Sequence, residues 1–273
     1  EHWYDKKTIR KLSKIKYLLD NIEEPYMKDF FNVIFSICCR KFSYSDPRIS
    51  VPVKINEHRF PEGHSLREAA NKHIRFIKLN NVFEFFIDQA NKNIARLKSY
   101  QNATMFNNNE IVIYNSDIKE IDDNLIKDGS VQLILTSPPY VSAQKYIRAS
   151  SLSLQWLGLN NNSLSSLDKK SIGREYFSPN EYKQFYKTGF KTIDTILLKI
   201  FEKNKLRAYI TYTYLIEMQK MFQKSFAILK EKGYFIMVIG NNTIAGYEFM
   251  TYKYLIEIAE KIGFSTELVL IDD

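Results

Sequence analysis

Cysteine is scarce in this sequence: the 273 residues contain only Cys38 and Cys39, which are neighbours in an apolar stretch. Adjacent cysteines rarely form a disulfide with each other, so we expect a pair of reduced core residues in a cytoplasmic protein. The chain also lacks an apolar run of the roughly 18–20 residues that a membrane-spanning helix needs. Residues 1–5 show neither the basic nor the apolar region of a signal peptide. These absences predict a soluble cytoplasmic protein without a membrane partner.

Metal-ligand motifs are missing as well. The four histidines show no zinc-type spacing and have no cysteine partners, namely His2, His58, His64 and His73. We therefore expect no metal site.

The excess of positive charge lies almost entirely in the first third of the chain. The net charge is +8, and residues 1–100 hold 19 Lys/Arg against 12 Asp/Glu. Such asymmetry indicates a polyanionic partner, and nucleic acid is the first candidate. The alternative is a solvated, lysine-rich surface without a specific partner.

Helical spacing dominates residues 1–105. Apolar residues recur at helical intervals over 5–42, with an interruption at Pro25, and a long helix is expected from about Ser65 to Tyr100. Residues 43–64 contain three prolines and a glycine, which predicts a long structured loop between these helices. We interpret 1–105 as a helical region with a basic loop that is a candidate for DNA contact.

The pattern changes to alternating strands and helices over 106–273. We expect four apolar strands, at 111–114, 131–135, 234–239 and 266–271, and three helices, at 118–127, 218–230 and 247–262. Alternation of this kind predicts an α/β domain with a mostly parallel sheet. Ligands bind beyond the carboxyl ends of such strands, which is where Asp117, Ser137 to Tyr140 and Gly240 to Thr243 fall.

The sharpest motif is Thr136-Ser137-Pro138-Pro139-Tyr140, directly after the strand at 131–135. Two prolines fix the backbone and remove two N–H donors, so carbonyl groups are left to face a pocket. A carbonyl and a small hydroxyl accept hydrogen bonds from an exocyclic amine, and an aromatic ring stacks on a base flipped from the duplex. The alternative is a proline-stiffened turn that contains a serine by accident.

On this motif the chain resembles the amino-methyltransferases of prokaryotic restriction–modification systems, specifically the N4-cytosine branch with the signature S/T-S-P-P-Y. The resemblance covers roughly 106–273, where Asn115-Ser116-Asp117 ends one strand and Lys232-Gly233-Tyr234-Phe235 leads to Val238-Ile239-Gly240-Asn241-Asn242. It implies a Rossmann-like class I methyltransferase sheet that lacks its first strand or strands, preceded by an N-terminal helical region. Residues 106–273 would then be the catalytic domain.

The resemblance also implies residue roles. Ser137 and the Pro138 carbonyl would accept hydrogen bonds from the cytosine N4 amine at the corner that Pro139 completes, while Tyr140 stacks on the base. The methyl group would come from S-adenosylmethionine by in-line transfer, with positioning as the main source of rate. Its binding site would include Asp117 at the adenine amine, with Ser116 and Thr136 beside it. Asp117 at a strand–helix junction is equally suited to cap a helix.

Methylation of a ring carbon is disfavoured by the cysteine positions. That reaction needs a cysteine nucleophile, and neither Cys38 nor Cys39 follows a proline. Two alternative targets are adenine N6 and an RNA base amine. Ser137 favours cytosine, because the adenine branch usually has Asp or Asn at that position.

A glycine-rich cofactor loop of the type Phe-x-Gly-x-Gly is not found in the sequence. The nearest candidate, Gly240 to Gly246, has two widely spaced glycines and is interpreted as a later loop of the same sheet. We expect that the loop lies upstream of Glu1 or on a second polypeptide. The remaining alternative is a non-catalytic DNA-binding fragment or subunit of a split enzyme.

Two basic segments are candidates for contact with double-stranded DNA. The first combines positive charge with Tyr44 and Phe60, and its cations are Arg40, Lys41, Arg48, Lys54 and Arg59. The second, 142–177, follows the catalytic motif and places five residues around Trp156: Gln144, Lys145, Tyr146, Arg148 and Arg174. For each segment, a solvated basic loop is the competing interpretation.

Overall fold

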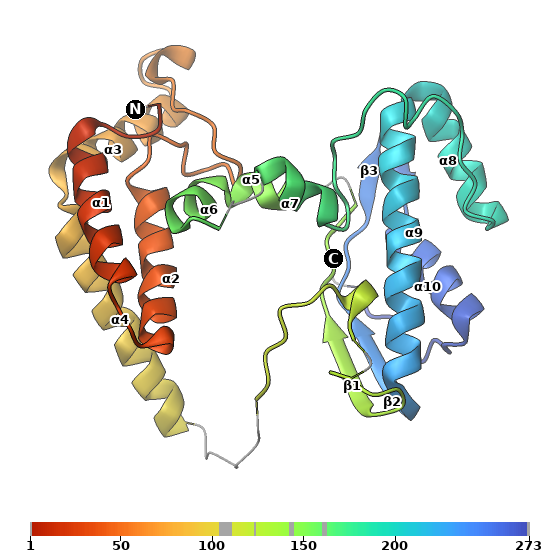
Figure 1. Ribbon diagram of the computed structural model, residues 1–273. Helices are drawn as coiled ribbons and strands as arrows, with labels where there is room; N and C mark the ends of the chain where they lie inside the picture. The colour runs from red at the N-terminus through yellow and green to blue at the C-terminus, as the bar shows by residue number, and fades with distance from the viewer. Residues whose placement is uncertain (1, 104–110, 123, 142–144, 160–162, 272–273) are drawn as a thin grey trace. The chain divides into compact units, whose positions relative to one another are not determined.

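The computed structural model describes residues 2–103, 111–122, 124–141, 145–159 and 163–271. They form two compact units, which are drawn in Figure 1 and described separately here. Unit 1 comprises Glu1–Ile111 and Tyr146–Leu167, and unit 2 comprises Val112–Lys145 and Asp168–Asp273. The expected division at 105/106 left residues 146–167 in the catalytic domain. The structure groups them with the N-terminal helices, because α6 (Ser151–Leu157) packs on α2 (Pro25–Lys41).

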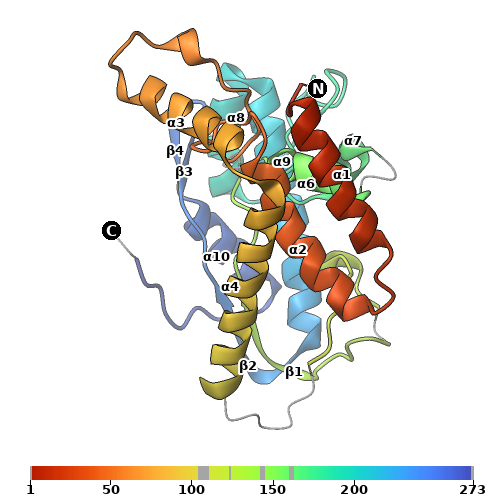
Figure 2. The same ribbon diagram turned by 90° about the vertical axis from the view of Figure 1, so that its left-hand side faces the viewer.

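Unit 1 is helical, as the sequence predicts. Helix α1 (Lys6–Asp20), helix α2 and helix α4 (Val82–Ala103) lie side by side (Figures 1 and 2). Pro25 occupies the first turn of α2, where its missing N–H costs nothing, so it starts this helix. The short elements of the unit are η1 (Glu57–Arg59) and α5 (Tyr146–Ala149), and α7 (Leu164–Lys170) crosses into unit 2.

The single helix expected from Ser65 to Tyr100 is wrong. The structure has α3 (Ser65–Leu79) and then α4, with Asn80 in an extended conformation between them. The Asn81 side chain accepts a hydrogen bond from the backbone N–H of Phe83, at 3.2 Å. Short polar side chains that satisfy backbone groups at a helix start are the reason for this break.

The core of unit 1 explains the adjacent cysteines. Cys38 and Cys39 are free thiols that are fully buried among Leu12, Phe35 and Phe42, so the prediction of core residues is confirmed. Burial raises the pKa of the Cys38 thiol to about 12. A thiol that stays protonated is a poor nucleophile, and these cysteines are packing residues.

Unit 2 is built on two parallel strands, β1 (Val131–Thr136) and β2 (Leu229–Met237). Ile134 pairs with Phe235, and Thr136 pairs with Met237. Phe235 and Met237 face a core formed with α8 (Lys191–Lys203), α9 (Lys205–Ile228) and α10 (Thr251–Ile262). The helix expected at 218–230 is thus the second half of α9, and α8 was missed.

Three other expected elements are corrected. Residues 111–114 and 266–271 are not strands, and the helix expected at 118–127 is reduced to the single turn η2 (Ile118–Glu120). The helix expected at 247–262 begins only at Thr251, because residues 242–249 form the hairpin β3 (Asn242–Ile244) and β4 (Tyr247–Phe249). Ala245 and Gly246 both have positive φ, as a tight two-residue hairpin turn requires.

One face of the parallel sheet is apolar and uncovered. Leu133 pairs with Tyr234 and Leu135 with Ile236, and these four side chains are between 48% and 68% exposed. The opposite face, with Phe235, packs on the core. Two strands with one bare apolar face are marginal by themselves, and 111–114 and 266–271 lie outside this sheet.

None of the described helices combines the length and the apolar character that crossing a bilayer requires.

Candidate active site

The proline motif forms an open corner at the end of β1. The backbone N–H of Val238 donates to the Thr136 carbonyl at 3.0 Å, so the ends of β1 and β2 are held together. Ser137 is exposed, Pro138 is buried and Tyr140 is half-buried. The corner is therefore anchored by one proline and presents its hydroxyl to solvent.

Tyr140 is placed by the residues that follow β2. A Cβ atom added to Gly240 would lie 3.3 Å from Cε2 of Tyr140, so the ring lies against the glycine backbone. The Asn242 side chain donates to the Val141 carbonyl at 2.6 Å. The sequence predicts that these two segments meet because the carboxyl ends of parallel strands share one edge, and this prediction is confirmed.

The segment around Gly173 borders the corner from a third direction, and the sequence analysis missed it. An added Cβ at Gly173 would lie 3.9 Å from Cβ of Pro139 and 3.7 Å from Cδ2 of Tyr214 on α9. Gly173 has φ +77°, a conformation that other residues rarely adopt. The isolated glycine between Ile172 and Arg174 was the sequence signal for such a turn.

Asp117 caps η2, as the helix-capping role suggested by its position at a strand–helix junction predicts. Its carboxylate accepts a hydrogen bond from the Lys119 backbone N–H at 3.0 Å and pairs with Nζ of Lys119 at 3.3 Å. The capped turn packs on α9, and Ser116 beside it is exposed. The cap leaves Asp117 on the surface, so its role at a cofactor stays a prediction.

Glu217 connects these parts. Oε1 of Glu217 lies 3.7 Å from Nζ of Lys119, and its carboxylate also accepts a hydrogen bond from the backbone of Gly173. Burial raises the pKa of Glu217, while Lys119 opposes this shift. Because Tyr214 and Glu217 are one helical turn apart, α9 carries both the Asp117 turn and the Pro139 side of the corner.

Three residues were expected at S-adenosylmethionine. Asp117 and Ser116 are exposed in the segment that begins η2, and Thr136 is the last residue of β1. The segment Gly240–Gly246, the nearest candidate for a glycine-rich loop, is instead part of the β3–β4 hairpin. The sequence analysis interpreted this segment as a later loop of the same sheet, whereas β3 and β4 form a separate antiparallel sheet.

The first basic segment uses most of its cations internally. Nη2 of Arg40 donates to the Asp46 carbonyl at 3.3 Å, and burial lowers the pKa of Arg40. Nζ of Lys41 lies 4.7 Å from the centre of the Phe76 ring. Arg48 forms a two-pronged pair with Asp46, at 2.8 and 2.5 Å.

Arg48 is exposed despite its pair with Asp46, and two further exposed cations form no ion pair with the described residues. Lys54 and Arg59 both point to solvent, and Arg59 lies 5.6 Å from the Phe60 ring. Of the five predicted DNA contacts in this segment, these two are the ones that the structure leaves available.

The second basic segment is divided between the units. Lys145 belongs to unit 2 and pairs with Glu175 at 3.4 Å, whereas Arg148 is exposed on α5 of unit 1. Trp156, which the polar residues of this segment flank in the sequence, packs edge-on against Tyr4 and Phe35 in the unit 1 core. The structure does not describe Gln144.

The small parallel sheet with a proline corner at its end is compatible with an α/β methyltransferase. The chain is similar to the Type II methyltransferase M.MvaI of Kocuria varians, with 23% identity over 274 residues. The alignment covers 96% of this chain and 56% of the relative, so the chain spans about half of the relative's length. This distant similarity supports a relationship to restriction–modification methyltransferases. No family model and no solved structure matches the chain.

Proposed function

We propose that this chain carries the base-binding half of an S-adenosylmethionine-dependent DNA methyltransferase that modifies the N4 amine of cytosine. The observation that carries the proposal is the corner itself. Ser137 is exposed beside the half-buried Tyr140 at the carboxyl end of a parallel strand. A corner packed inside the core, with its hydroxyl covered, would have excluded this function.

In the proposed reaction the corner positions a cytosine that has left the duplex. The Ser137 hydroxyl and the Pro138 carbonyl accept hydrogen bonds from the N4 amine, which aims the nitrogen lone pair. Tyr140, held against Gly240, stacks on the base, while Pro139 and Gly173 fix the far side of the corner. S-adenosylmethionine supplies the methyl group, and no covalent link between protein and base is needed.

Asp117 is proposed to accept a hydrogen bond from the adenine amine of the cofactor, with Ser116 and Thr136 beside it. The pair of Lys119 with Asp117 and with Glu217 fixes this carboxylate relative to α9. The rest of the cofactor site is proposed to come from polypeptide outside these 273 residues, in the same chain or a second one. The bare face around Leu135 and the 56% coverage of the relative support this proposal.

Duplex DNA is the proposed substrate, and Lys54 and Arg59 are proposed phosphate contacts in unit 1. Lys145 and Arg148 are further candidates, while Arg40, Lys41 and Arg48 shape the loop that presents Lys54 and Arg59.

Nucleoside mass spectrometry tests the target. Duplex DNA is incubated with S-adenosylmethionine and the full polypeptide that contains this sequence, then digested to nucleosides. N4-methylcytosine is the expected product. N6-methyladenine would replace the cytosine assignment, and methylation confined to RNA would replace the DNA assignment.

A second candidate function is a DNA-binding subunit that does not itself bind the cofactor. It is favoured by the β3–β4 hairpin, which occupies the segment where a glycine-rich loop was sought. Calorimetric titration of the isolated chain with S-adenosylmethionine separates the two functions. Tight binding without any partner rules out the second candidate.

A further inference from the structure

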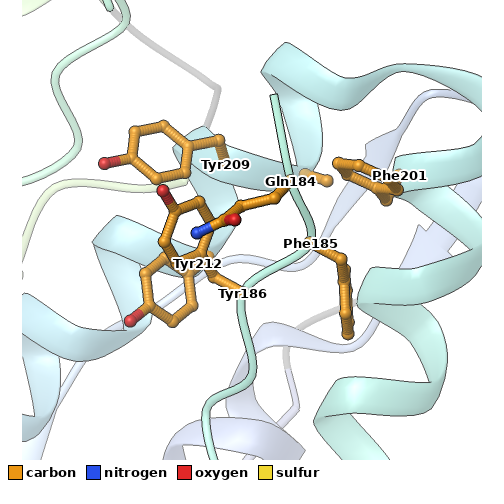
Figure 3. Close-up of a pocket in the computed structure, with 7 residues that line it drawn as sticks. Gln184, Phe185, Tyr186, Phe201, Tyr209 and Tyr212 are labelled. Atoms are coloured by element: carbon orange, nitrogen blue, oxygen red, sulfur yellow. The ribbon is translucent and has the colours of Figure 1, made fainter. Parts of the chain in front are cut away.

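Unit 2 carries a cluster of three tyrosines near the catalytic corner, which we call the tyrosine shelf: Tyr186, Tyr209 and Tyr212. The rings of Tyr186 and Tyr212 are stacked, with centroids 5.3 Å apart, and those of Tyr209 and Tyr212 are 6.1 Å apart. Tyr209 and Tyr212 are three residues apart on α9, so they share one face of that helix. Figure 3 shows the three rings together beside the segment that carries Gln184.

The shelf is rigid on one side and open on the other. Phe185 and Phe201 lie with ring centroids 5.6 Å apart and pack against the unit 2 core. In Figure 3 the tyrosine hydroxyl groups lie on the side of the cluster away from these two phenylalanines. The shelf lines a shallow hollow of about 10 Å³ together with Gln184, Phe185 and Phe201. Within the described part of the chain, none of the three hydroxyl groups forms a hydrogen bond.

The shelf is connected to the catalytic corner by direct contacts. The Phe177 ring lies 4.8 Å from that of Tyr209, and the Arg174 guanidinium lies 4.0 Å over Phe177. Arg174 follows Gly173, which borders Pro139. Along α9, Tyr209 precedes Tyr214 by five residues, a rise of about 7.5 Å.

Positive charge gathers around the shelf. Residues 101–273 together hold 20 Lys/Arg against 19 Asp/Glu, but residues 182–209 hold seven against two. Lys183, Lys187 and Lys205 are exposed, and Nζ of Lys205 lies 5.3 Å from the ring of Phe201. The nearly neutral C-terminal part of the chain therefore places three exposed lysines beside the tyrosines or their neighbour Phe201, while Glu181, just before this stretch, is an acidic neighbour of Tyr209.

We propose that the tyrosine shelf, with Lys183, Lys187 and Lys205, binds the phosphate backbone of the DNA strand next to the extruded base. The inference depends on the proposed function, because it assumes a duplex at the corner. Tyrosine hydroxyls and lysines are common donors to phosphate oxygens, and such contacts fix the register of a protein on DNA. Burial raises the pKa of Tyr209, so its phenol remains a donor at neutral pH.

The test compares duplex binding by the full polypeptide and its variants, measured by fluorescence anisotropy over a range of salt concentrations. The double variant Tyr209→Phe/Tyr212→Phe keeps both rings and removes two hydroxyls. It should lower the affinity about tenfold, since each hydrogen bond contributes a factor of a few. The triple variant Lys183→Gln/Lys187→Gln/Lys205→Gln should reduce the slope of log Kd against log salt by about 0.9 for each lost phosphate contact.

Tyr252→Phe on α10 is the matched control, because it removes one hydroxyl from another half-buried tyrosine of unit 2 and should leave affinity unchanged. Wild-type affinity and salt slope in both shelf variants, with DNA still bound, would overturn the shelf and leave the methyltransferase proposal intact. A wild-type protein that binds no duplex at low salt would overturn both.

Discussion

The loop at 43–64 in unit 1 and the tyrosine shelf in unit 2 show how differently the same residue types are used. The loop has the stronger positive charge in the sequence, yet Arg48 is paired with Asp46 and Arg40 is bonded to backbone carbonyls. The shelf lies in the nearly neutral part of the chain, and its lysines are exposed. The internal partners of each cation, which the local net charge does not reveal, therefore decide which cations are left exposed for the proposed contacts with DNA.

The cores of the two units also differ in how completely they are covered. Unit 1 closes around Phe35, Trp156 and the buried cysteines. Unit 2 buries one face of its sheet and leaves Leu133 and Leu135 exposed on the other. The uncovered face therefore lies in the unit that carries the proposed active site.

The largest effect is expected at the corner of unit 2. Tyr140→Ala removes the ring that is proposed to stack on the base, and it should lower kcat/KM for methyl transfer at least about 100-fold, because misplaced reactants lose the benefit of orientation. Tyr140→Phe keeps the ring and should retain most activity. Single-turnover methylation assays on the full polypeptide measure both. Equal losses in the two variants would contradict a stacking role.

A core substitution in each unit tests whether the units are independent. Phe35→Ala in unit 1 and Phe222→Ala in unit 2 each remove a ring that is at most 1% exposed, and each should cost about 3–5 kcal/mol of stability. Hydrogen exchange read by mass spectrometry should show lost protection only in the unit that carries the substitution. Loss of protection in both units after either change would mean that they unfold together.

The sequence was sufficient where a local pattern determines the structure. Helical spacing predicted α1 and α2, and the run of β-branched and aliphatic residues predicted β1 with the proline corner at its end. The approach of Gly240 to Tyr140 also followed from sequence, because parallel strands end at one edge.

Features that depend on tertiary partners were not predictable. Residues 111–114 have a strand-like composition but no neighbouring strand to pair with, so they remain outside the sheet. The sequence around Trp156 does not indicate that its ring contacts Tyr4 and Phe35, which are more than 100 residues away. The shelf was missed for the same reason, since Tyr186 meets Tyr209 and Tyr212 only after α9 has folded against its segment.

A smaller effect distinguishes structural from binding cations in the loop of unit 1. Arg48→Gln breaks the pair with Asp46 and the bond to the Leu66 carbonyl, so it should lower the free energy of unfolding by about 1–2 kcal/mol. Lys54→Gln/Arg59→Gln should leave stability within about 0.5 kcal/mol and reduce the salt slope of DNA binding by about 1–2. Urea unfolding and anisotropy measure the two quantities. The assignment of Arg48 as structural and of Lys54 and Arg59 as DNA contacts fails if Arg48→Gln changes only the salt slope and the double variant changes only stability.

The smallest effect concerns pH and the same loop. The Nε2–H of the buried His73 donates to the Ser43 carbonyl at 3.0 Å, and burial lowers the pKa of His73. Lys41 and Arg40 lower it further, whereas Asp46 and the bond to Ser43 raise it. Because the folded pKa lies below the unfolded value of about 6.5, the unfolded chain binds the proton first as pH falls.

Stability of unit 1 should therefore be complete above about pH 6.5 and decline below it until the folded pKa is reached. His73→Gln keeps an N–H donor for Ser43 but does not titrate, so its urea midpoint should be flat between about pH 5 and 7, where the wild-type midpoint falls. The pKa of Asp46 is lowered by Arg48, and its contribution is lost only below its usual range, which keeps the two effects separate. A His73→Gln protein with the wild-type pH dependence would show that another group titrates, and the loop would then owe its pH response to a residue outside the His73–Ser43 contact.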